Sequence, residues 1–358
     1  MLRALRTPEG KETCRGTGVE RANHNPTHVD PVSVTFIEEE KMKTAFLLLA
    51  ALVASAPTSH AWAQTYPTRP VRLIAPFPPG GGTDLLSRII AVPMSESLGQ
   101  TVVVDNRPGA GGAIGAEITA RAAPDGHTLI LVSSSYCATS AYQKIPYDPV
   151  KDIQPIILIG TTGLVVSVHP QVAATSIKAL IAQAKANPGK LNYASVGTGS
   201  VAHLGFELFK QMSGANIVHV PYKGGGPALT AVVAGEVQAT LISLVPTIPH
   251  VRAGRLRPLG ITTAKRSALL PDVPSISETV PGFEVTHWYG MWGPKGIPKP
   301  IITRWNRGVA KVLLTDAMKR QMQGEGLETA AGPPEEFLKY VSRDVAKWRK
   351  VIKAAGIK

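Results

Sequence analysis

The chain has 358 residues, of which 44% are hydrophobic and 18% are charged; this composition fits one large or two medium globular domains and excludes a disordered or fibrous protein. It contains no run of about 18 apolar residues, so the sequence predicts no membrane-spanning helix. The formal net charge is +13, but the basic residues are scattered and no nucleic-acid-binding motif accompanies them. We therefore expect no nucleic-acid partner and interpret the charge as a solvated basic face that helps to attract small anions.

The first feature in chain order is an export signal. Met42 and a lysine precede the apolar run 45–54, and Ala-Trp-Ala follows at 61–63. A basic start, an apolar segment and small residues in this order are typical of a cleaved signal peptide. We expect residues 1–41 to be an upstream extension wrongly included in the protein, residues 42–63 to be a signal peptide, and the mature protein, residues 64–358, to be exported. A cytosolic protein with a buried apolar helix is the alternative.

Strand-like and helix-like segments alternate through the rest of the chain, which predicts α/β architecture with largely parallel sheets. The expected strands are Val71–Ala75, Thr101–Asp105, Thr128–Ser133, Ile156–Gly160, Leu164–Val168, Leu191–Ser195, Ile217–Val220, Ala239–Ser243, Leu259–Thr262 and Val285–Met291. Apolar residues at three- and four-residue spacing predict the helices. These are Asp84–Leu98, Gly112–Ala123, Ile177–Ala186, Ser200–Ser213, Pro227–Ala234, Pro300–Leu314 and Glu335–Ala355.

Two composition changes divide this part of the chain into two lobes. A new βα series begins after His169-Pro170, and an aromatic, glycine-rich segment crosses at Trp288–Pro294. We expect lobe 1 to consist of 64–165 plus 290–358 and lobe 2 of 166–289. Because ligands in such sheets bind outside the carboxyl ends of strands, the loops that follow certain strands should face one cleft. Those strands end at Ala75, Ser133, Ser195, Val220 and Ser243.

The first candidate loop runs from Ala75 to Asp84, with the sequence APFPPGGGTD. Consecutive glycines leave the backbone unshielded, and Thr83 or Asp84 is a natural first residue for the helix that follows. Free N–H groups and the positive end of the helix dipole then suit a carboxylate or a phosphate. A plain turn between strand and helix is the alternative.

Two further loops have similar chemistry. The segment from Ser195 to His203 offers Thr198 and Ser200 as donors to a second anionic group, although Ser200 could also simply cap its helix. After the next strand, Tyr222 could supply an apolar wall and Lys223 a cation, although a loop lysine is commonly just solvated. The hydroxyls of 133–135 suit a ligand or an ordinary polar loop equally.

Enzyme motifs are weak by comparison. The run GAGGAIG at 109–115 lacks the glycine spacing of a dinucleotide fingerprint, and nucleophile-elbow, Walker and H-E-x-x-H motifs are absent from the sequence. The histidines stand singly, and Cys137 is the only cysteine after residue 63. We therefore expect no catalytic residues, no metal, no cofactor and no internal disulfide.

Taken together, these motifs resemble those of the Bug receptors, the periplasmic substrate-binding proteins of tripartite tricarboxylate transporters. The resemblance covers essentially all of 64–358 and rests on these segments: YPTRP at 66–70, PFPPGGGTD at 76–84, VDNRPGAGGAIG at 104–115, APDG at 123–126, LNYAS at 191–195, VPYKG at 220–224 and LPDVP at 270–274.

The resemblance implies a two-lobed, type II periplasmic binding fold that closes around a small carboxylate and delivers it to a membrane permease. It implies that backbone N–H groups and water hold the carboxylate at Pro79–Asp84, with contacts from lobe 2 at Ser195–Ser200 and Tyr222–Gly224. The expected ligand-binding residues are Phe77, Pro79, Gly80, Gly81, Gly82, Thr83, Asp84, Ser133, Ser134, Ser195, Gly197, Thr198, Gly199, Ser200, His203, Tyr222, Lys223, Gly224 and Ser243.

One position departs from many relatives, which carry an aspartate near the end of the strand that corresponds to Ala239–Ser243. Here Ile242 and Ser243 occupy that place. A carboxylate there could pair with a ligand ammonium, so its absence favours an organic acid over an amino acid.

The leading prediction is therefore a monomeric solute receptor that is neither an enzyme nor embedded in the membrane. One alternative is an exported α/β enzyme acting on a small carboxylate or ester, with Ser200 or Ser135 as the nucleophile. In that interpretation His203 lies one helical turn after Ser200, but no orienting carboxylate is evident nearby. Another alternative is a sensing receptor that presents its closed form to a membrane histidine kinase.

Overall fold

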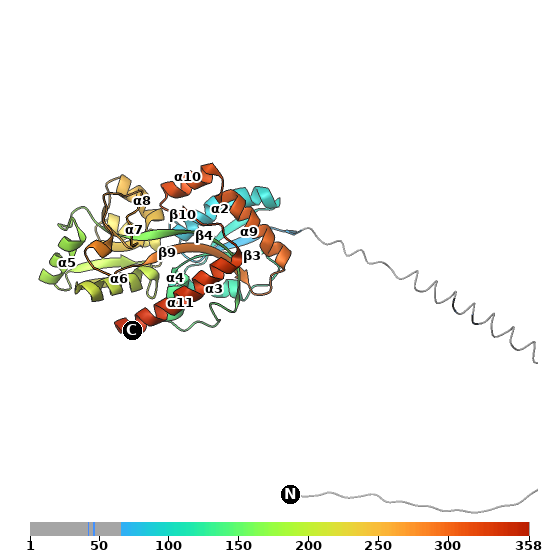
Figure 1. Ribbon diagram of the computed structural model, residues 1–358, viewed down its shortest axis with the longest axis horizontal. Coiled ribbons are helices and arrows are strands. Elements are labelled where there is room, and N and C mark those ends of the chain that lie inside the picture. The colour runs from blue at the N-terminus through green and yellow to red at the C-terminus, as the bar shows by residue number, and fades with distance from the viewer. Residues whose placement is uncertain (1–41, 43–45, 47–65, 358) are drawn as a thin grey trace, which may run out of the picture. The chain divides into compact units, whose positions relative to one another are not determined.

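The computed structural model describes residues 66–357, together with Met42 and Phe46 (Figure 1). The expected upstream extension and signal peptide therefore lie outside the described residues, apart from those two positions. In the part of the chain that is described, no helix is long and apolar enough to cross a membrane.

A mixed β-sheet forms the centre of the fold, with the strand order β2-β1-β3-β9-β4-β7-β5-β6; β8 and β10 also pair with β4. The strands are β1 Val71–Ala75, β2 Val102–Asn106, β3 Thr128–Ser133, β4 Ile153–Val168, β5 Leu191–Ser195, β6 Ile217–Pro221, β7 Ala239–Ser243, β8 Arg257–Ile261, β9 Thr286–Pro294 and β10 Glu328–Thr329.

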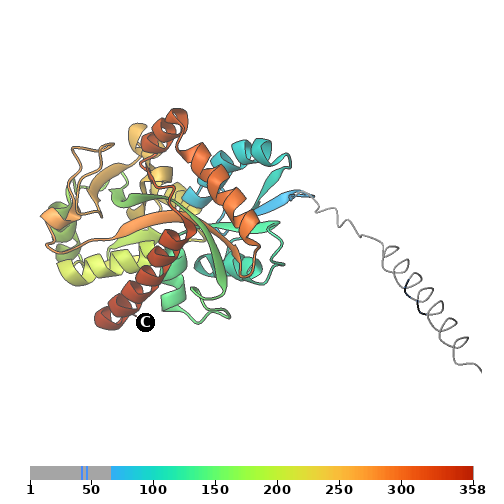
Figure 2. The same ribbon diagram turned by 45° about the vertical axis from the view of Figure 1, so that its right-hand side comes forward.

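Helices flank this sheet. They are α2 Gly82–Leu98, α3 Ala113–Ala120, α4 Ser135–Tyr142, α5 Ile177–Ala186, α6 Val201–Ser213, α7 Gly225–Val233, α8 Leu244–Arg252, α9 Lys299–Leu313, α10 Asp316–Gly324 and α11 Pro334–Ala355, with short 3-10 turns η1 Ala110–Gly112 and η2 Ile276–Glu278. Figure 1 shows α5, α6, α7 and α8 on one side of the fold and α2, α3 and α9 on the other. In Figure 2, α11 runs across the front of the sheet.

The expectation of largely parallel sheets is wrong for the centre of the fold. β1 is parallel to β2 and β3, and β5 is parallel to β6 and β7. β9 and β4, however, run antiparallel to each other and to the parallel groups on either side. The parallel groups come from βα units, which need a crossover helix, whereas β4 and β9 carry the chain from one group to the other and back.

β4 is one long strand where the sequence pattern indicated two. The polar stretch Thr161-Thr162-Gly163 suggested a break, but β-branched threonines remain extended, and the Thr162 hydroxyl donates to the Gly326 carbonyl at 2.6 Å. β4 pairs with β9 over 153–163, with β7 over 164–168 and with β8 over 165–168. The strand therefore joins the two halves of the sheet.

Three helices escaped sequence prediction. α4 has the sequence SYCATSAY, in which small and hydroxyl residues have weak helix propensity, and α8 contains Pro249 in its interior. α10 follows α9 after only Leu314 and Thr315, so the two merge into one apolar pattern. These helices form because tertiary packing overrides weak local preference.

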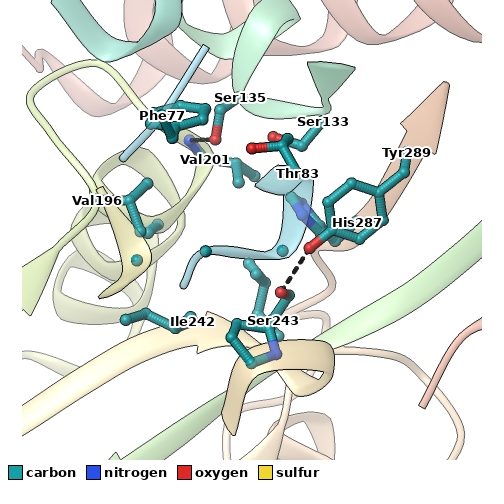
Figure 3. A pocket seen from close by; sticks show the side chains of 16 residues that line it. Phe77, Thr83, Ser133, Ser135, Val196, Val201, Ile242, Ser243, His287 and Tyr289 are labelled. Atoms are coloured by element: carbon teal, nitrogen blue, oxygen red, sulfur yellow. Dashed lines mark hydrogen bonds between the residues drawn. The ribbon is translucent and has the colours of Figure 1, made fainter. Parts of the chain in front are cut away.

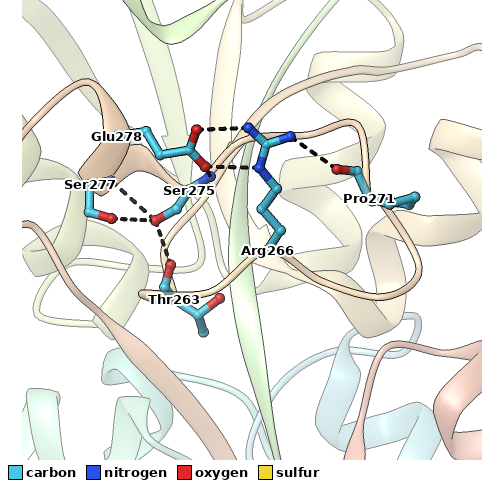
Figure 4. Close-up of polar contacts among 6 residues, drawn as sticks. All are labelled: Thr263, Arg266, Pro271, Ser275, Ser277 and Glu278. Carbon is cyan, nitrogen blue, oxygen red and sulfur yellow. Dashed lines mark hydrogen bonds and ion pairs between the residues drawn. The ribbon is translucent and has the colours of Figure 1, made fainter.

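The LPDVP segment lies in the long connection after β8, where side chains hold an irregular chain in place (Figure 4). Arg266 donates to both carboxylate oxygens of Glu278, at 2.9 and 2.7 Å, and to the Pro271 carbonyl. Ser275 caps η2 and donates to the Thr263 carbonyl at 2.7 Å. This motif therefore has a structural role away from the cavity described below.

Candidate functional site

A narrow cavity of about 40 Å³, within about 400 Å³ of space that includes open solvent, lies where the two halves of the sheet meet. Its lining combines small residues, hydroxyls and an apolar wall (Figure 3). The lining residues are Phe77, Gly81, Gly82, Thr83, Ser133, Ser135, Leu164, Val196, Val201, Ala202, Gly225, Ile242, Ser243, Pro246, His287 and Tyr289. The structure thus confirms that the loops after β1, β3, β5, β6 and β7 face one cleft.

Helices α2, α4, α6, α7 and α8 all begin at this cavity. Their N-terminal ends each carry about half a positive charge and unpaired N–H groups. For α2, α4, α7 and α8, no side chain caps these groups in the described structure. The cavity is therefore surrounded by positive dipole ends, although no cation lies in its wall.

The side chains that line the cavity add no formal charge. None of the described lining residues is Asp, Glu, Lys or Arg. Burial lowers the pKa of His287 to about 3, so its imidazole is neutral near pH 7. Burial also raises the pKa of the Tyr289 hydroxyl well above its usual range. An anion in this space would thus meet dipoles and neutral donors only.

The first loop brings backbone to the cavity. A Cβ on Gly82 would lie 2.0 Å from the Tyr289 hydroxyl oxygen, so only glycine fits there without a shift. Gly81 precedes α2 and has no such obstruction. The Thr83 hydroxyl is buried and without a hydrogen-bond partner among the described residues. This unpaired donor and the uncapped helix start both indicate a place for an acceptor atom.

Asp84 stabilises the loop from outside the cavity. Its carboxylate accepts hydrogen bonds from the Gly80 N–H, the Arg88 guanidinium and the Asn106 amide, each at 3.0 Å. Asn106 also donates to the Phe77 carbonyl at 2.9 Å. Burial alone would raise the pKa of Asp84, but these hydrogen bonds outweigh it and lower the pKa. Asp84 therefore positions the loop and does not line the cavity.

The second loop contributes different residues from those expected. Ser195 pairs with His219 at 2.7 Å, and Ser200 accepts from the His203 N–H at 3.2 Å as the cap of α6. His203 in turn accepts from the Gly199 N–H, and Thr198 is exposed. The cavity is lined instead by Val196, Val201 and Ala202. Gly197 lies against Gly111, also outside the lining.

The third loop mainly contacts the first. A Cβ on Gly224 would lie 2.5 Å from a ring carbon of Pro78, and Lys223 is exposed. Tyr222 lines a neighbouring surface groove together with Pro79 and Gly80. From this loop, Gly225 reaches the cavity.

Sequence reasoning missed His287 and Tyr289, which stand two residues apart on β9 and so share one face. Tyr289 lies on the aromatic crossing segment Trp288–Pro294, which we interpret from the sequence only as a lobe boundary, and His287 immediately precedes that segment. Tyr289 and Ser243 share a hydrogen bond of 2.7 Å (Figure 3). The alternation of His287, Trp288 and Tyr289 is the signal that could have identified this wall. Leu164, Ile242 and Pro246 complete the missed lining.

The structure also creates a serine–histidine pair, because Ser134 lies 2.6 Å from His287 Nδ1. It does not have the properties of a nucleophile and base. Ser134 is fully buried and does not line the cavity, and no described carboxylate orients the imidazole. With a pKa of about 3, His287 is also a poor proton acceptor. Ser135, proposed as an alternative nucleophile, accepts from the Val201 N–H at 3.3 Å.

Comparison with known proteins identifies relatives of the same architecture. The profile of the family described as "Tripartite tricarboxylate transporter family receptor" matches residues 86–357. Protein BugT of Bordetella pertussis is 38% identical over 316 residues, which cover 87% of this chain and 96% of BugT.

Solved structures agree with this match. The structure of R. palustris Rpa4515 with adipate has a TM-score of 0.79 and 39% identity, and the match covers 81% of this chain and 98% of that one. MatC (Rpa3494) from Rhodopseudomonas palustris with bound malate has a TM-score of 0.77 and 31% identity, with 80% and 100% covered. The matching family is described as a receptor family, and the similar structure of BugD, with a TM-score of 0.79 and 33% identity over 82% of this chain and 99% of that one, is described as a periplasmic binding protein, which identifies a receptor and not an enzyme. The chain therefore belongs to the receptor family of tripartite tricarboxylate transporters and has the two-lobed fold of periplasmic binding proteins.

Proposed function

We propose that this receptor binds a small organic carboxylate in the cavity beside Gly81, Gly82 and Thr83 and delivers it to the membrane permease of a tripartite transporter. The observation that carries the proposal is the convergence of uncapped helix starts on a cavity without charged side chains. Such a site favours an anion by hydrogen bonds and field together. The relatives described with adipate and with malate support a dicarboxylate among the candidates.

We further propose that the ligand lacks an ammonium group. Ile242 and Ser243 both line the cavity, and none of the described lining residues is a carboxylate. An ammonium there would have no carboxylate partner and would face positive dipole ends. Calorimetry with a panel of mono-, di- and tricarboxylates and amino acids tests this. Binding of carboxylates without an amino group is expected, whereas tight binding of amino acids alone would refute the proposal.

The variant Gly81→Val tests the location of the site. A Cβ at Gly81 has ordinary contacts, 3.7 Å to the Gly225 nitrogen and to the Pro78 carbonyl, and its φ of −87° suits any residue. The fold should therefore survive, while the bulk blocks backbone approach to the ligand. A ligand at about 100 times its Kd stabilises by about 2.7 kcal/mol, which raises the Tm by a few °C.

We expect Gly81→Val to retain the melting temperature of the ligand-free protein and to lose the upward shift caused by adipate or malate. Gly324→Val is the matched control, because a Cβ there meets nothing within 4 Å. An unchanged ligand shift in Gly81→Val would place the binding site elsewhere.

The lobe boundaries, the export signal and the oligomeric state complete the proposal. We place lobe 1 at 64–165 plus 290–358 and lobe 2 at 166–289; the change of β4 partners between Gly163 and Leu164 supports the first boundary. We propose that residues 42–63 direct export to the periplasm and that the mature receptor is a monomer. N-terminal sequencing of the exported protein tests the signal, and light scattering tests the oligomeric state.

A further inference from the structure

His287 lies in the wall of the cavity. Which of its two ring nitrogens carries the proton decides whether the ring can donate a hydrogen bond to a ligand. The residue is 4% exposed, and its Nδ1 lies 2.6 Å from the hydroxyl of Ser134. Its Nε2 has no hydrogen bond to a described residue and is not sealed from solvent. His287 lines the cavity, and Nε2 is the ring nitrogen that Ser134 does not engage.

A neutral imidazole can present either an acceptor or a donor at Nε2. If Nδ1 carried the proton, it would donate to Ser134, and the Ser134 hydroxyl proton would need another acceptor. Ser134 is 0% exposed, and its side chain makes no other hydrogen bond in the described structure. That arrangement leaves a buried donor unpaired, which is unfavourable because the donor has lost its hydrogen bonds to water.

The opposite arrangement leaves no buried donor unpaired. The Ser134 hydroxyl donates to an unprotonated Nδ1, and the ring proton sits on Nε2, where water or a ligand can accept it. The Ser134 side chain makes no capping hydrogen bond at the start of α4, so no such bond competes with its bond to His287. Hydrogen-bond satisfaction therefore selects the tautomer protonated at Nε2.

We propose that Ser134 holds His287 in the tautomer protonated at Nε2, so that His287 is a neutral N–H donor that contacts the bound carboxylate. The inference rests on the proposed function, because it assigns a contact within the same cavity. It also accounts for anion binding on this wall without a cation. His287 is the ligand-contacting residue in this assignment, and Ser134 is a positioning residue.

Hydroxyl groups elsewhere in the cavity wall also have protons that could be donated to a ligand. Tyr289 and Ser243 share one hydrogen bond, so whichever hydroxyl donates, the other retains a proton that can turn to the cavity. The Thr83 hydroxyl is likewise unpaired. These hydroxyl protons are therefore available to donate to a carboxylate oxygen.

The tautomer can be measured without any ligand. Nitrogen-15 NMR of the full chain labelled in its histidine rings, at pH 7, should show His287 neutral, with Nδ1 unprotonated and Nε2 protonated. The signal is assigned by its disappearance in His287→Gln. In Ser134→Ala this pure tautomer should give way to a mixture or to the other form. Ser140→Ala is the control, because the Ser140 hydroxyl in α4 bonds to the Tyr136 carbonyl. This variant should leave the His287 tautomer unchanged. A His287 signal protonated at Nδ1, or at both nitrogens, would overturn the assignment.

Paired variants test the contact with the ligand, using adipate and malate as probes in calorimetry. A glutamine amide nitrogen can occupy the place of Nε2, whereas an asparagine amide reaches only the place of Nδ1. We expect His287→Asn to lose at least about 10-fold in affinity for the tighter probe and His287→Gln to stay within about threefold of the parent. Equal affinities in both variants, or equal losses, would overturn the contact.

The experiments distinguish a failure of the proposed function from a failure of the His287 assignment. If no carboxylate of the panel binds the parent protein, the proposed function and the ligand contact both fall, whereas the tautomer is decided by the NMR experiment alone. If carboxylates bind and Gly81→Val abolishes binding but the two His287 variants behave alike, the proposed function stands and the His287 contact is wrong.

Discussion

At the scale of single residues, Asp84 shows how a side chain next to a binding loop can serve the loop and not the ligand. Its carboxylate joins the Gly80 amide, Arg88 and Asn106, which fixes the curve of the glycine segment. The carboxylate had been expected among the ligand contacts, but it would repel a bound anion. Its hydrogen bonds instead hold the loop in the shape in which Gly81 and Gly82 line the cavity.

Asp84→Asn should destabilise the protein by about 2 kcal/mol at pH 7, because hydrogen bonds to a charged group are worth about 1.5–3 kcal/mol. The pKa of Asp84 is lowered in the folded protein, so its contribution is complete above the unfolded pKa of about 3.9 and is lost as the pH falls through the folded pKa. Urea unfolding at pH 7 and at pH 3 measures this. A difference between the parent and Asp84→Asn that persists unchanged at pH 3 would contradict the assignment.

At the scale of elements, α6 and the strands β5 and β6 share an aromatic stack beside the cavity. Tyr193 stacks on Phe206 with ring centroids 3.8 Å apart, and His203 stacks on His219 at 4.1 Å. Burial, with a smaller contribution from His203, lowers the pKa of His219 to about 4. Burial also lowers the pKa of His203. His203 was expected among the ligand-binding residues; in the structure it stacks on His219 as a neutral ring and joins α6 to the sheet.

This stack should make the protein sensitive to acid. The unfolded chain binds a proton at His219 with a pKa of about 6.5, whereas the folded protein does so only near pH 4. The contribution of His219 to stability is therefore complete above pH 6.5 and decreases by up to about 1.4 kcal/mol per pH unit below it. His219→Gln should show a shallower loss of unfolding free energy between pH 6.5 and 4. Equal slopes for the parent and the variant would refute this role.

At the scale of the whole molecule, the two halves of the sheet touch through backbone at the edge of the cavity. A Cβ on Gly226 would lie 2.5 Å from the Pro79 carbonyl oxygen, so the loop after β6 rests directly on the loop after β1. On the other side, the Val201 N–H at the start of α6 donates to Ser135 in α4 at 3.3 Å. These contacts describe a closed arrangement around the ligand space.

Gly226→Ala should hinder this closure without unfolding either half. Alanine favours the first turn of α7 by up to about 1 kcal/mol over glycine, so the ligand-free protein should not lose stability. Affinity for adipate or malate should fall at least about 10-fold, and small-angle scattering should show no compaction on adding the probe. Gly324→Ala, at the open end of α10, is the control. Full affinity in Gly226→Ala would mean that closure does not need this contact.

The sequence by itself determined the α/β class, most strand positions and the set of loops at the cavity, because strand runs and glycine-rich turns are local signals. It also placed Gly81, Gly82 and Thr83 in the cavity wall, since a loop that joins the carboxyl end of a strand to the start of a helix lies at the carboxyl edge of the sheet.

Only the tertiary structure decided which side chains complete the wall. His287 and Tyr289 reach the cavity because β9 crosses antiparallel between β3 and β4, a pairing between segments more than a hundred residues apart that no local pattern reports. Asp84, Ser195 and His203 bond to partners 4 to 24 residues away along the chain and do not line the cavity. Buried polar groups must find hydrogen bonds, and which partner is near enough depends on the fold as a whole.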